Sequence, residues 1–409
     1  MKNRKILPVI LFWTLYISYT STYILRLNLS CASSALEQIG KMSTAQLASL
    51  GGVFSMTYAI GKLLNGGIGD RVKPWIMVTV GLLLAGFGNL VFGFLPPYGA
   101  MLVCWGLNAF GQSMLWGAIL RLVSSIFDEE TARKRAPVMG TSIAMGNILG
   151  ILLSSWLVTN WSIQTVFWIP GTLAIGLAVI VLLTGHKTVT QESKGVFPLR
   201  QLLRPEVLIM VLPAVIQGAI KDNVSLFMVD YFAKQFLLDT TLNPFYILFI
   251  PLSGLVGRMV YPMVYKWLGC NEDRASMLGF LFCALCALPL SLNLGGATVA
   301  TLCLCGIYAF ISIVNTSFLS MYPLHFAREG NVSSISSVMD FVIYLGHAVS
   351  TTIYGVLIVR YGYDAMYLTW VFISIAAVIL LGLNTVVLRR MNSAKDAFPH
   401  INGKCNNND

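Results

Sequence analysis

Long apolar runs recur along this chain, and short polar stretches separate them. Each run has about 20 residues, the length that an α-helix needs to cross the hydrocarbon core of a bilayer. A segment in lipid must also satisfy its own backbone N–H and C=O groups, which a helix does. The pattern predicts an all-α membrane protein with about twelve transmembrane helices. The expected spans are 8–31, 45–68, 76–95, 99–122, 137–158, 163–184, 206–231, 244–265, 275–292, 297–320, 333–357 and 364–388.

The longest interior polar stretch, residues 185–205, lies between six predicted spans and six more. Its position predicts two pseudo-symmetric six-helix halves around a central cavity, at residues 1–184 and 206–390, joined by a cytoplasmic linker. Halves of this kind hold a substrate site between them near the middle of the bilayer. The last residues, 391–409, are polar and rich in asparagine, which predicts a disordered cytoplasmic tail.

Only 11% of the 409 residues are charged, and 56% are hydrophobic. Because an ordinary soluble domain carries about 25% charged residues, this composition excludes a soluble fold. The basic start and first apolar run resemble a signal peptide. No small-residue cleavage pattern follows them, so we expect an uncleaved first helix.

The net charge of +10 follows the predicted topology. Nineteen basic residues fall in loops and tails on the side of the N-terminus, and only Lys41, Lys234 and Arg360 fall in the opposite loops. This positive-inside bias predicts that both termini are cytoplasmic, and it argues against a basic surface for nucleic acid. The nineteen are Lys2, Arg4, Lys5, Arg71, Lys73, Arg133, Lys134, Arg135, Lys187, Lys194, Arg200, Arg204, Lys266, Arg274, Arg328, Arg389, Arg390, Lys395 and Lys404.

Five charged residues lie deep in predicted spans: Arg26, Lys62, Lys221, Asp222 and Asp340. An ionised residue at a helix centre costs roughly 2.5–3.5 kcal/mol on insertion scales, so each of them requires an explanation. They could be snorkelling or mutually neutralising charges with a structural role. The three cations outnumber the two acids, however, and a cavity with that surplus attracts an anion.

Two of these charged residues have a tyrosine nearby in the sequence, which favours a binding role for them. Tyr23 lies three residues before Arg26, and Tyr58 lies one turn before Lys62, so each tyrosine shares a helix face with a cation. We favour function for Arg26 and Lys62, whereas Arg121 and Arg258 lie near helix ends and fit a structural role. Lys221 could be neutralised by Asp222 or by Asp340, and we expect Asp340 to lie beside it. His347, seven residues after Asp340, should share its face.

A glycine-rich turn with an acid and bases, residues 66–73, follows the second span. This G-x-x-x-D-R pattern resembles the signature loop of the major facilitator superfamily. We expect Asp70 and Arg71 to fix helix ends as a conformational latch that does not touch cargo.

The runs at residues 23–28 and 58–66 resemble the organophosphate:phosphate antiporter family, which includes glycerol-3-phosphate and hexose-phosphate transporters and a sugar-phosphate sensor. The likeness extends to Gln112 and Trp116 and to residues 344–346. It implies that Arg26 is a family arginine, that Lys62 lies in the substrate cavity, and that Tyr23 and Tyr58 are cavity tyrosines.

Two departures from that family limit the comparison. Its second phosphate-binding arginine falls on Gln217, and its fifth-helix histidine falls on Met145. Lys221 follows Gln217 by one turn and could supply charge there, without the bidentate fork of arginine. Residues 26–30 also resemble the anion:cation symporters, whose acidic residue before the arginine is Leu25 here. Proton coupling would then use Asp340, Asp222 or His347.

These patterns predict a secondary active transporter of a small phosphorylated or carboxylated anion, with protons or inorganic phosphate as the coupling ion. A membrane sensor of such an anion is the alternative. We expect no enzyme and no ATP-driven pump, because no nucleophile elbow, phosphate loop or metal-binding set occurs, and hence no metal or cofactor. The expected location is the bacterial inner membrane, as a monomer with the lipid bilayer as its surroundings.

Overall fold

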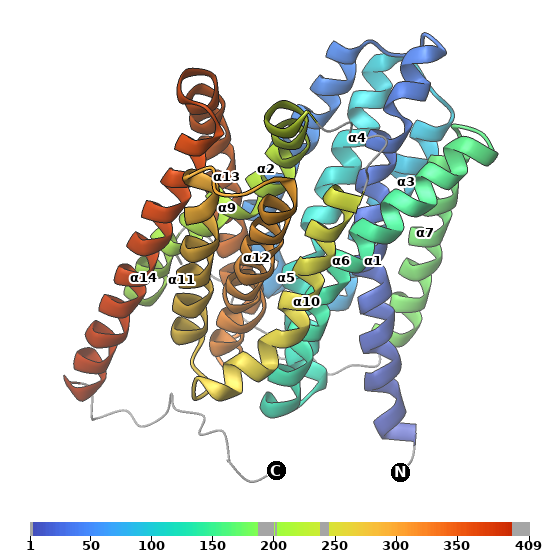
Figure 1. Ribbon diagram of the computed structural model, residues 1–409. Helices are drawn as coiled ribbons and strands as arrows, with labels where there is room; N and C mark the ends of the chain where they lie inside the picture. The colour runs from blue at the N-terminus through green and yellow to red at the C-terminus, as the bar shows by residue number, and fades with distance from the viewer. Residues whose placement is uncertain (1–2, 187–199, 201–202, 238–244, 395–409) are drawn as a thin grey trace. The chain divides into compact units, whose positions relative to one another are not determined.

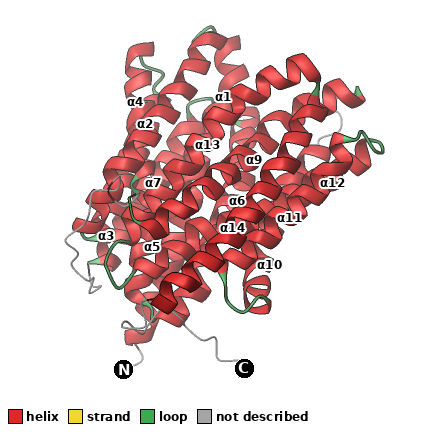
Figure 2. Ribbon diagram, turned by 90° about the vertical axis from the view of Figure 1, so that its left-hand side faces the viewer, coloured by secondary structure: helices red, strands yellow, loops and turns green. Residues whose placement is uncertain are grey.

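A computed structural model describes residues 3–186, 200, 203–237 and 245–394, and in these residues every regular element is a helix (Figure 1). The first group of α-helices is α1 (Asn3–Gln38), α2 (Thr44–Arg71), α3 (Pro74–Gly93), α4 (Tyr98–Ser113), α5 (Leu115–Ile126), α6 (Glu129–Asn160) and α7 (Thr165–Gly185). The second group is α9 (Pro205–Phe236), α10 (Phe245–Trp267), α11 (Glu272–Ser291), α12 (Ala297–Thr316), α13 (Val332–Tyr361) and α14 (Tyr363–Ala394). Short connections join most of them (Figure 2).

Each predicted span falls on helix, although the helices extend beyond most of the predicted ends. Nine helices of the described part are long and apolar enough to cross a membrane. The other predicted spans, 45–68, 99–122 and 244–265, are helical but fall outside that set. Large apolar side chains such as Leu302, 68% exposed, and Phe372, 64% exposed, lie on helix surfaces, as lipid-facing residues do.

Local sequence signals set several of the helix ends. Ser43 caps α2, because its side chain accepts from the Gln46 backbone N–H while the Gln46 side chain accepts from the Ser43 backbone N–H. Asp128 caps α6 through the Thr131 backbone N–H. Pro74 opens α3 at a position where its missing N–H has no helical partner to lose.

The described residues form two compact units. Unit 1 comprises residues 1–201 and 323–341, and unit 2 comprises residues 202–322 and 342–409. In unit 1, α3 packs against α4 and α7, and α2 packs against α4; in unit 2, α11 packs against α12 and α14, and α10 packs against α12. The same pairing in the same chain order is the internal repeat that the sequence predicts.

Some details differ from the expected spans. The span at 99–122 is broken at Met114 into α4 and α5. The Ser113 hydroxyl at this point donates to the Phe110 carbonyl and accepts from the Asn65 amide, and such side-chain bonds compete with the helical ladder. α14 extends to Ala394, into the segment expected to be disordered, and the rest of that segment lies outside the described residues, as does most of the linker.

Candidate anion-binding site

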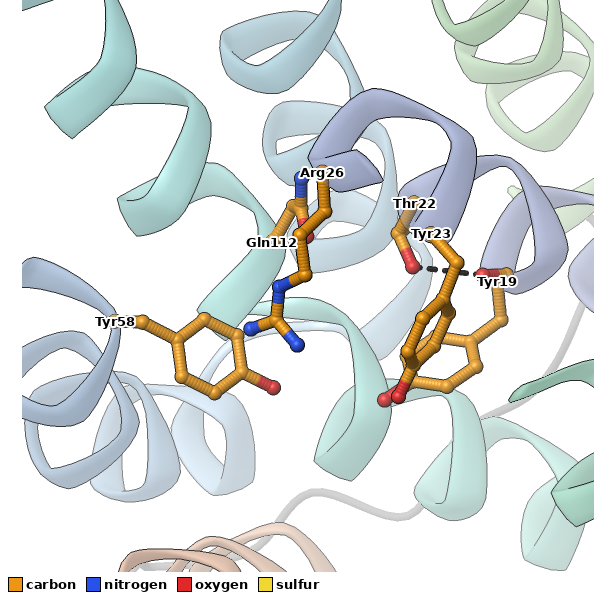
Figure 3. A pocket seen from close by; sticks show the side chains of 6 residues that line it. All are labelled: Tyr19, Thr22, Tyr23, Arg26, Tyr58 and Gln112. Carbon is orange, nitrogen blue, oxygen red and sulfur yellow. Dashed lines mark hydrogen bonds between the residues drawn. The ribbon is translucent and has the colours of Figure 1, made fainter. Parts of the chain in front are cut away.

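Four polar side chains line one face of α1 and open a small cavity inside unit 1. Tyr19, Thr22, Tyr23 and Arg26 recur at the three- and four-residue spacing of a helix face. Tyr58 from α2 and Gln112 from α4 complete the lining (Figure 3). The cavity volume is about 10 Å³, about the room that one water molecule needs. In this conformation it can receive an oxygen atom of a ligand, and a whole metabolite requires it to widen.

Arg26 is held in this cavity by aromatic rings. Its Cζ lies 4.6 Å from the ring centre of Phe54, 4.8 Å from that of Tyr58 and 5.8 Å from that of Tyr23. Figure 3 shows the guanidinium directed between Tyr58 and the two tyrosines of α1. Ring faces attract a cation, so they hold the guanidinium in place. A guanidinium presents a planar fork of N–H donors that matches a carboxylate or phosphate.

Hydrogen bonds between buried amide groups hold Gln112 in place in the wall of this cavity. The Gln112 amide donates to Asn108 Oδ1 at 2.9 Å, and the Asn108 amide donates to the Leu25 carbonyl at 2.9 Å. This chain of hydrogen bonds ties α4 to the α1 backbone beside Arg26. Tyr19 and Thr22, which the sequence analysis missed, each lie four residues before a predicted site residue, Tyr23 and Arg26. That spacing is the signal that could have found them.

The Tyr58 ring, which lies beside Arg26, also lies beside Lys62. The Nζ of Lys62 is 5.0 Å from the Tyr58 ring centre and 2.5 Å from Asp340 Oδ2. The lysine side chain is 1% exposed and the aspartate side chain 8% exposed. The distance is that of a contact ion pair, although its angles fall outside hydrogen-bond geometry. The structure thus pairs Asp340 with Lys62, in place of the Lys221 expected from the sequence.

Lys221 belongs to a polar cluster within unit 2. Its Nζ lies 2.8 Å from Oδ1 of the neighbouring Asp222, and His347 lies within electrostatic range of both. Thr351 donates to Asn223 Oδ1 at 2.8 Å and lies 3.3 Å from His347 Nδ1. His347 therefore lies near Lys221 and Asp222, neighbours that its spacing from Asp340 did not reveal.

Gln217, four residues before Lys221, is fully buried on α9. Among the described residues, neither its amide oxygen nor its amide nitrogen has a hydrogen-bond partner. Leaving a buried amide unsatisfied costs about 1–3 kcal/mol, so this side chain is a candidate for contact with a polar ligand.

Asp70 binds the first turn of α13. Its two carboxylate oxygens accept from the backbone N–H groups of Ser333 and Ser334, each at 2.9 Å. The first N–H groups of a helix have no partner within the helix and carry partial positive charge, so they attract a carboxylate. Gly69 and Gly117 permit this approach; a Cβ at Gly117 would lie 2.7 Å from the Ser333 hydroxyl.

The second predicted latch residue, Arg71, is exposed, and Arg121 supports Asp70 more directly. Arg121 is buried on α5 and donates from Nη1 to the carbonyl of Gly69 at 2.5 Å and to that of Val72 at 2.8 Å. From its position in the sequence, Arg121 fits a structural role at a helix end. Its partners are backbone carbonyls from another helix, which sequence spacing does not reveal.

The surroundings of Asp70, which follows the second span, predict a pH effect on stability. Burial raises the pKa of its carboxyl from 3.8 to about 6, although hydrogen bonds from Ser334 and Ser333 and the charge of Arg121 oppose the rise. The folded chain therefore binds more protons than the unfolded chain between these values. The stability gained from this group is complete below about pH 4 and is lost as the pH rises through about 6.

Acidifying the protein from pH 7 to pH 5 should thus stabilise it by about 1 kcal/mol through Asp70. Thermal unfolding in detergent at both pH values measures this gain as the difference between wild type and Asp70→Asn, whose amide does not titrate. The same pH dependence in both proteins would show that Asp70 does not contribute.

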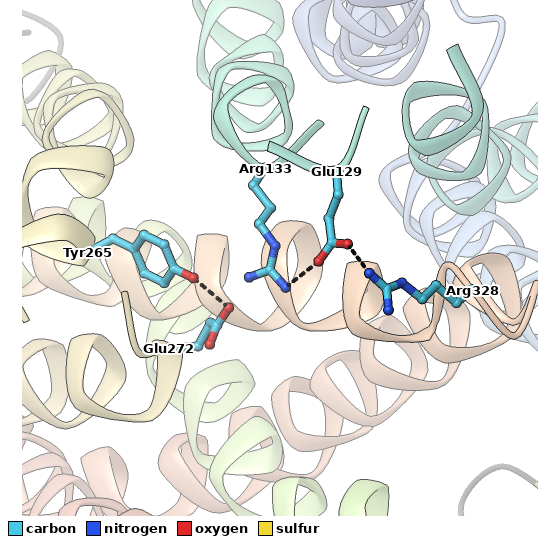
Figure 4. Close-up of polar contacts among 5 residues, drawn as sticks. All are labelled: Glu129, Arg133, Tyr265, Glu272 and Arg328. Atoms are coloured by element: carbon cyan, nitrogen blue, oxygen red, sulfur yellow. Dashed lines mark hydrogen bonds and ion pairs between the residues drawn. The ribbon is translucent and has the colours of Figure 1, made fainter. Parts of the chain in front are cut away.

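An exposed ion-pair cluster accompanies the latch in unit 1. Glu129, at the start of α6, accepts from Arg133 at 3.4 Å and from Arg328 at 2.9 Å (Figure 4). In unit 2, the Tyr265 hydroxyl donates to Glu272 at 3.1 Å. Exposed pairs are worth about 0–1 kcal/mol, so they adjust helix ends without defining the site.

Known proteins share this sequence pattern. Similar proteins include a probable hexose phosphate transport protein of Chlamydia pneumoniae, 24% identical over 50% of this chain and 44% of the relative. Membrane sensor protein UhpC of Salmonella typhimurium is 23% identical over 41% of this chain and 38% of the relative. Glucose-6-phosphate exchanger SLC37A1 of Homo sapiens is 27% identical over 36% of this chain and 30% of the relative. The chain thus matches less than half the length of these relatives, and they confirm the resemblance to the organophosphate:phosphate antiporters.

The fold has a close counterpart among solved structures. The transporter FucP, in its outward conformation, matches with a TM-score of 0.76 and 15% identity over 92% of this chain and 99% of that one. At that identity the match concerns the fold alone, and it confirms the predicted fold class. Together with the family match below, it shows a multi-pass membrane protein. Residues 10–351 match the family profile of the Major Facilitator Superfamily, to which this chain belongs.

Proposed function

We propose that the chain is a secondary active transporter of a small organic anion, phosphorylated or carboxylated, which works by alternating access as an exchanger or proton symporter. The observation that carries this proposal is Arg26, a guanidinium held among aromatic rings and lining a polar cavity with hydroxyl and amide groups. A positioned guanidinium binds a planar or tetrahedral oxyanion through two N–H groups.

The charges of both units support an anionic cargo. Arg26, Lys62 and Lys221 give the deep positions of the described chain three positive charges, against the two carboxylates of Asp222 and Asp340. Such a surplus attracts anions. Relatives named for hexose phosphate transport and glucose 6-phosphate exchange make sugar phosphates the first candidates.

The roles of the individual residues follow from their contacts. Arg26 binds the anionic group, Tyr23 and Tyr58 orient it, and Gln217 supplies an uncharged polar contact where an arginine would bind a second phosphate oxygen. Lys62 lies beside the carboxylate of Asp340, so it must exchange that partner for cargo, whereas Lys221 adds positive charge while it stays beside Asp222. The Asp70 contact with α13 stabilises one access state without touching cargo.

The surroundings of the transporter complete the proposal. We place it as a monomer in a bacterial inner membrane, with both termini in the cytoplasm, because the basic loops of its sequence favour that side. Protons or inorganic phosphate serve as the coupling ion.

Counterflow tests the proposal. Purified protein in liposomes loaded with unlabelled anion should accumulate the same anion in labelled form, and the panel comprises glucose 6-phosphate, glycerol 3-phosphate, inorganic phosphate and D-glucuronate. Saturable counterflow of at least one of them, absent from empty liposomes, is the expected result. The proposal fails if none of the four is exchanged by protein that remains folded.

A membrane sensor is the second candidate, because one similar protein is named as such. A sensor would bind the anion without moving it. Stabilisation against heat by a panel anion, together with an absence of counterflow, would favour this function over transport.

A further inference from the structure

In the described part of the chain, the pairs Lys221–Asp222 and Lys62–Asp340 lie in membrane helices, and they differ in how they could respond to a cargo anion. Lys221 and Asp222 are consecutive residues of α9, so no movement of a helix can separate them. Lys62 and Asp340 belong to α2 and α13, so a shift between these helices breaks their pair. Of these two pairs, the second is the one that a shift between helices would break.

The helices α2 and α13 contact each other at two places, the ion pair and the Asp70 carboxylate. Asp70 lies about 12 Å from Lys62 along α2, and Ser333 lies about 10 Å from Asp340 along α13. The hydrogen bonds from Ser333 and Ser334 to Asp70 therefore lie at one end of an antiparallel contact, and the ion pair lies about two turns further on. Releasing the first turn of α13 loosens the ion pair as well.

Asp340 also lies where α13 passes from one unit to the other. Residues to Phe341 cluster with unit 1, and residues from Val342 cluster with unit 2. In unit 2, α13 packs closely on α9, because a Cβ at Gly346 would collide with the Val215 carbonyl. Asp340 therefore lies within two residues of the boundary between the two units along this helix.

We propose that Asp340 is the residue that couples proton movement to anion transport, an inference that rests on the proposed transport function. When a cargo anion takes Lys62, the Asp340 carboxylate loses its cation inside a desolvated site. An unpaired buried carboxylate is costly, so it binds a proton from water at its carboxylate oxygen. When the anion leaves, Lys62 and Asp340 pair again and the proton returns to water on the other side.

This exchange keeps the buried charge balanced. Before binding, the ammonium of Lys62 and the carboxylate of Asp340 sum to zero. After binding, the ammonium and one anionic charge of the cargo sum to zero, and Asp340 is neutral. One proton accompanies each cargo anion that takes Lys62, which makes the chain a symporter.

Other titratable groups near the pair are already engaged. From α2, the Tyr58 ring lies 5.0 Å from Lys62 Nζ and 4.8 Å from Cζ of Arg26 on α1. Asp70, also on α2, accepts from the first turn of α13 beside Arg121 of α5. The ion pair of Asp340 with Lys62 joins α13 to α2.

Proton movement in liposomes tests the inference, with glucose 6-phosphate and D-glucuronate as the probes. For wild type, adding a transported probe should make the outer medium more alkaline, and an outer pH below the inner pH should speed accumulation. Asp340→Asn should reduce probe-driven proton movement at least tenfold, while exchange of labelled for unlabelled probe continues. Glu130→Gln, which removes an exposed carboxylate of α6, is the matched control and should keep the proton movement.

If Asp340→Asn fails to fold, the double variant Lys62→Gln/Asp340→Asn removes both charges. Its stabilisation by the probe should then lose the pH dependence that wild type shows. Proton movement that persists in Asp340→Asn, or that disappears equally in Glu130→Gln, overturns the inference. Wild-type exchange without proton movement also overturns it and leaves the transport function standing, whereas wild-type exchange of no panel anion rejects the transport function itself.

Discussion

Arg26→Gln is expected to lower the affinity for the transported anion by about 100-fold or more and to abolish measurable uptake. Hydrogen bonds to charged groups are worth about 1.5–3 kcal/mol each, and a bidentate contact contains two. Glutamine keeps a polar side chain of similar length in the cavity but has neither the charge nor the fork. Counterflow at several anion concentrations measures the loss, and detergent-solubilised protein with an unchanged elution profile shows that the variant folds.

Two companion variants make this result specific. Arg26→Lys keeps the charge among the rings but not the planar fork, so it should recover only part of the affinity. Arg133→Gln removes the same charge from a half-buried helix position beside Glu129, outside the candidate site, and should leave uptake at the wild-type level. Wild-type affinity in Arg26→Gln would exclude this guanidinium as the anion site.

The helical spans could be predicted because lipid imposes a length and an apolar composition on each of them. The apolar pattern predicts the helix ends less precisely. α1 extends beyond its apolar run to Gln38, and α14 extends to Ala394. Beside the break at Met114, the Ser113 hydroxyl accepts a hydrogen bond from Asn65 of another helix, and such contacts leave no periodic signal in the sequence.

Some features of the candidate site could likewise be predicted from the sequence, and others could not. Depth within an apolar run identified Arg26, Lys62 and Asp340, and helical spacing placed Tyr23 and Tyr58 beside the cations. Partners across helices could not be read from spacing, so Asp340 was assigned to Lys221 although the structure pairs it with Lys62. The roles of these residues in binding and coupling stay predictions.

The buried pair itself should have a large effect on stability. Removing one partner alone leaves a charge in a site that is nearly closed to solvent, so Lys62→Met and Asp340→Leu are each expected to cost about 3–5 kcal/mol of unfolding free energy. The double variant leaves no unpaired charge and should recover most of that loss. Unfolding of the four proteins in one detergent, without added anion, completes the double-mutant cycle.

A surface pair supplies the control for this cycle. Lys134 and Glu130 lie 2.6 Å apart on α6, with side chains 64% and 78% exposed. Water solvates either charge when its partner is removed, so their coupling should not exceed about 0.5 kcal/mol. If the losses from Lys62→Met and Asp340→Leu simply add in the double variant, the two side chains do not neutralise each other in the folded protein, and the exchange of partners proposed for Lys62 has no basis.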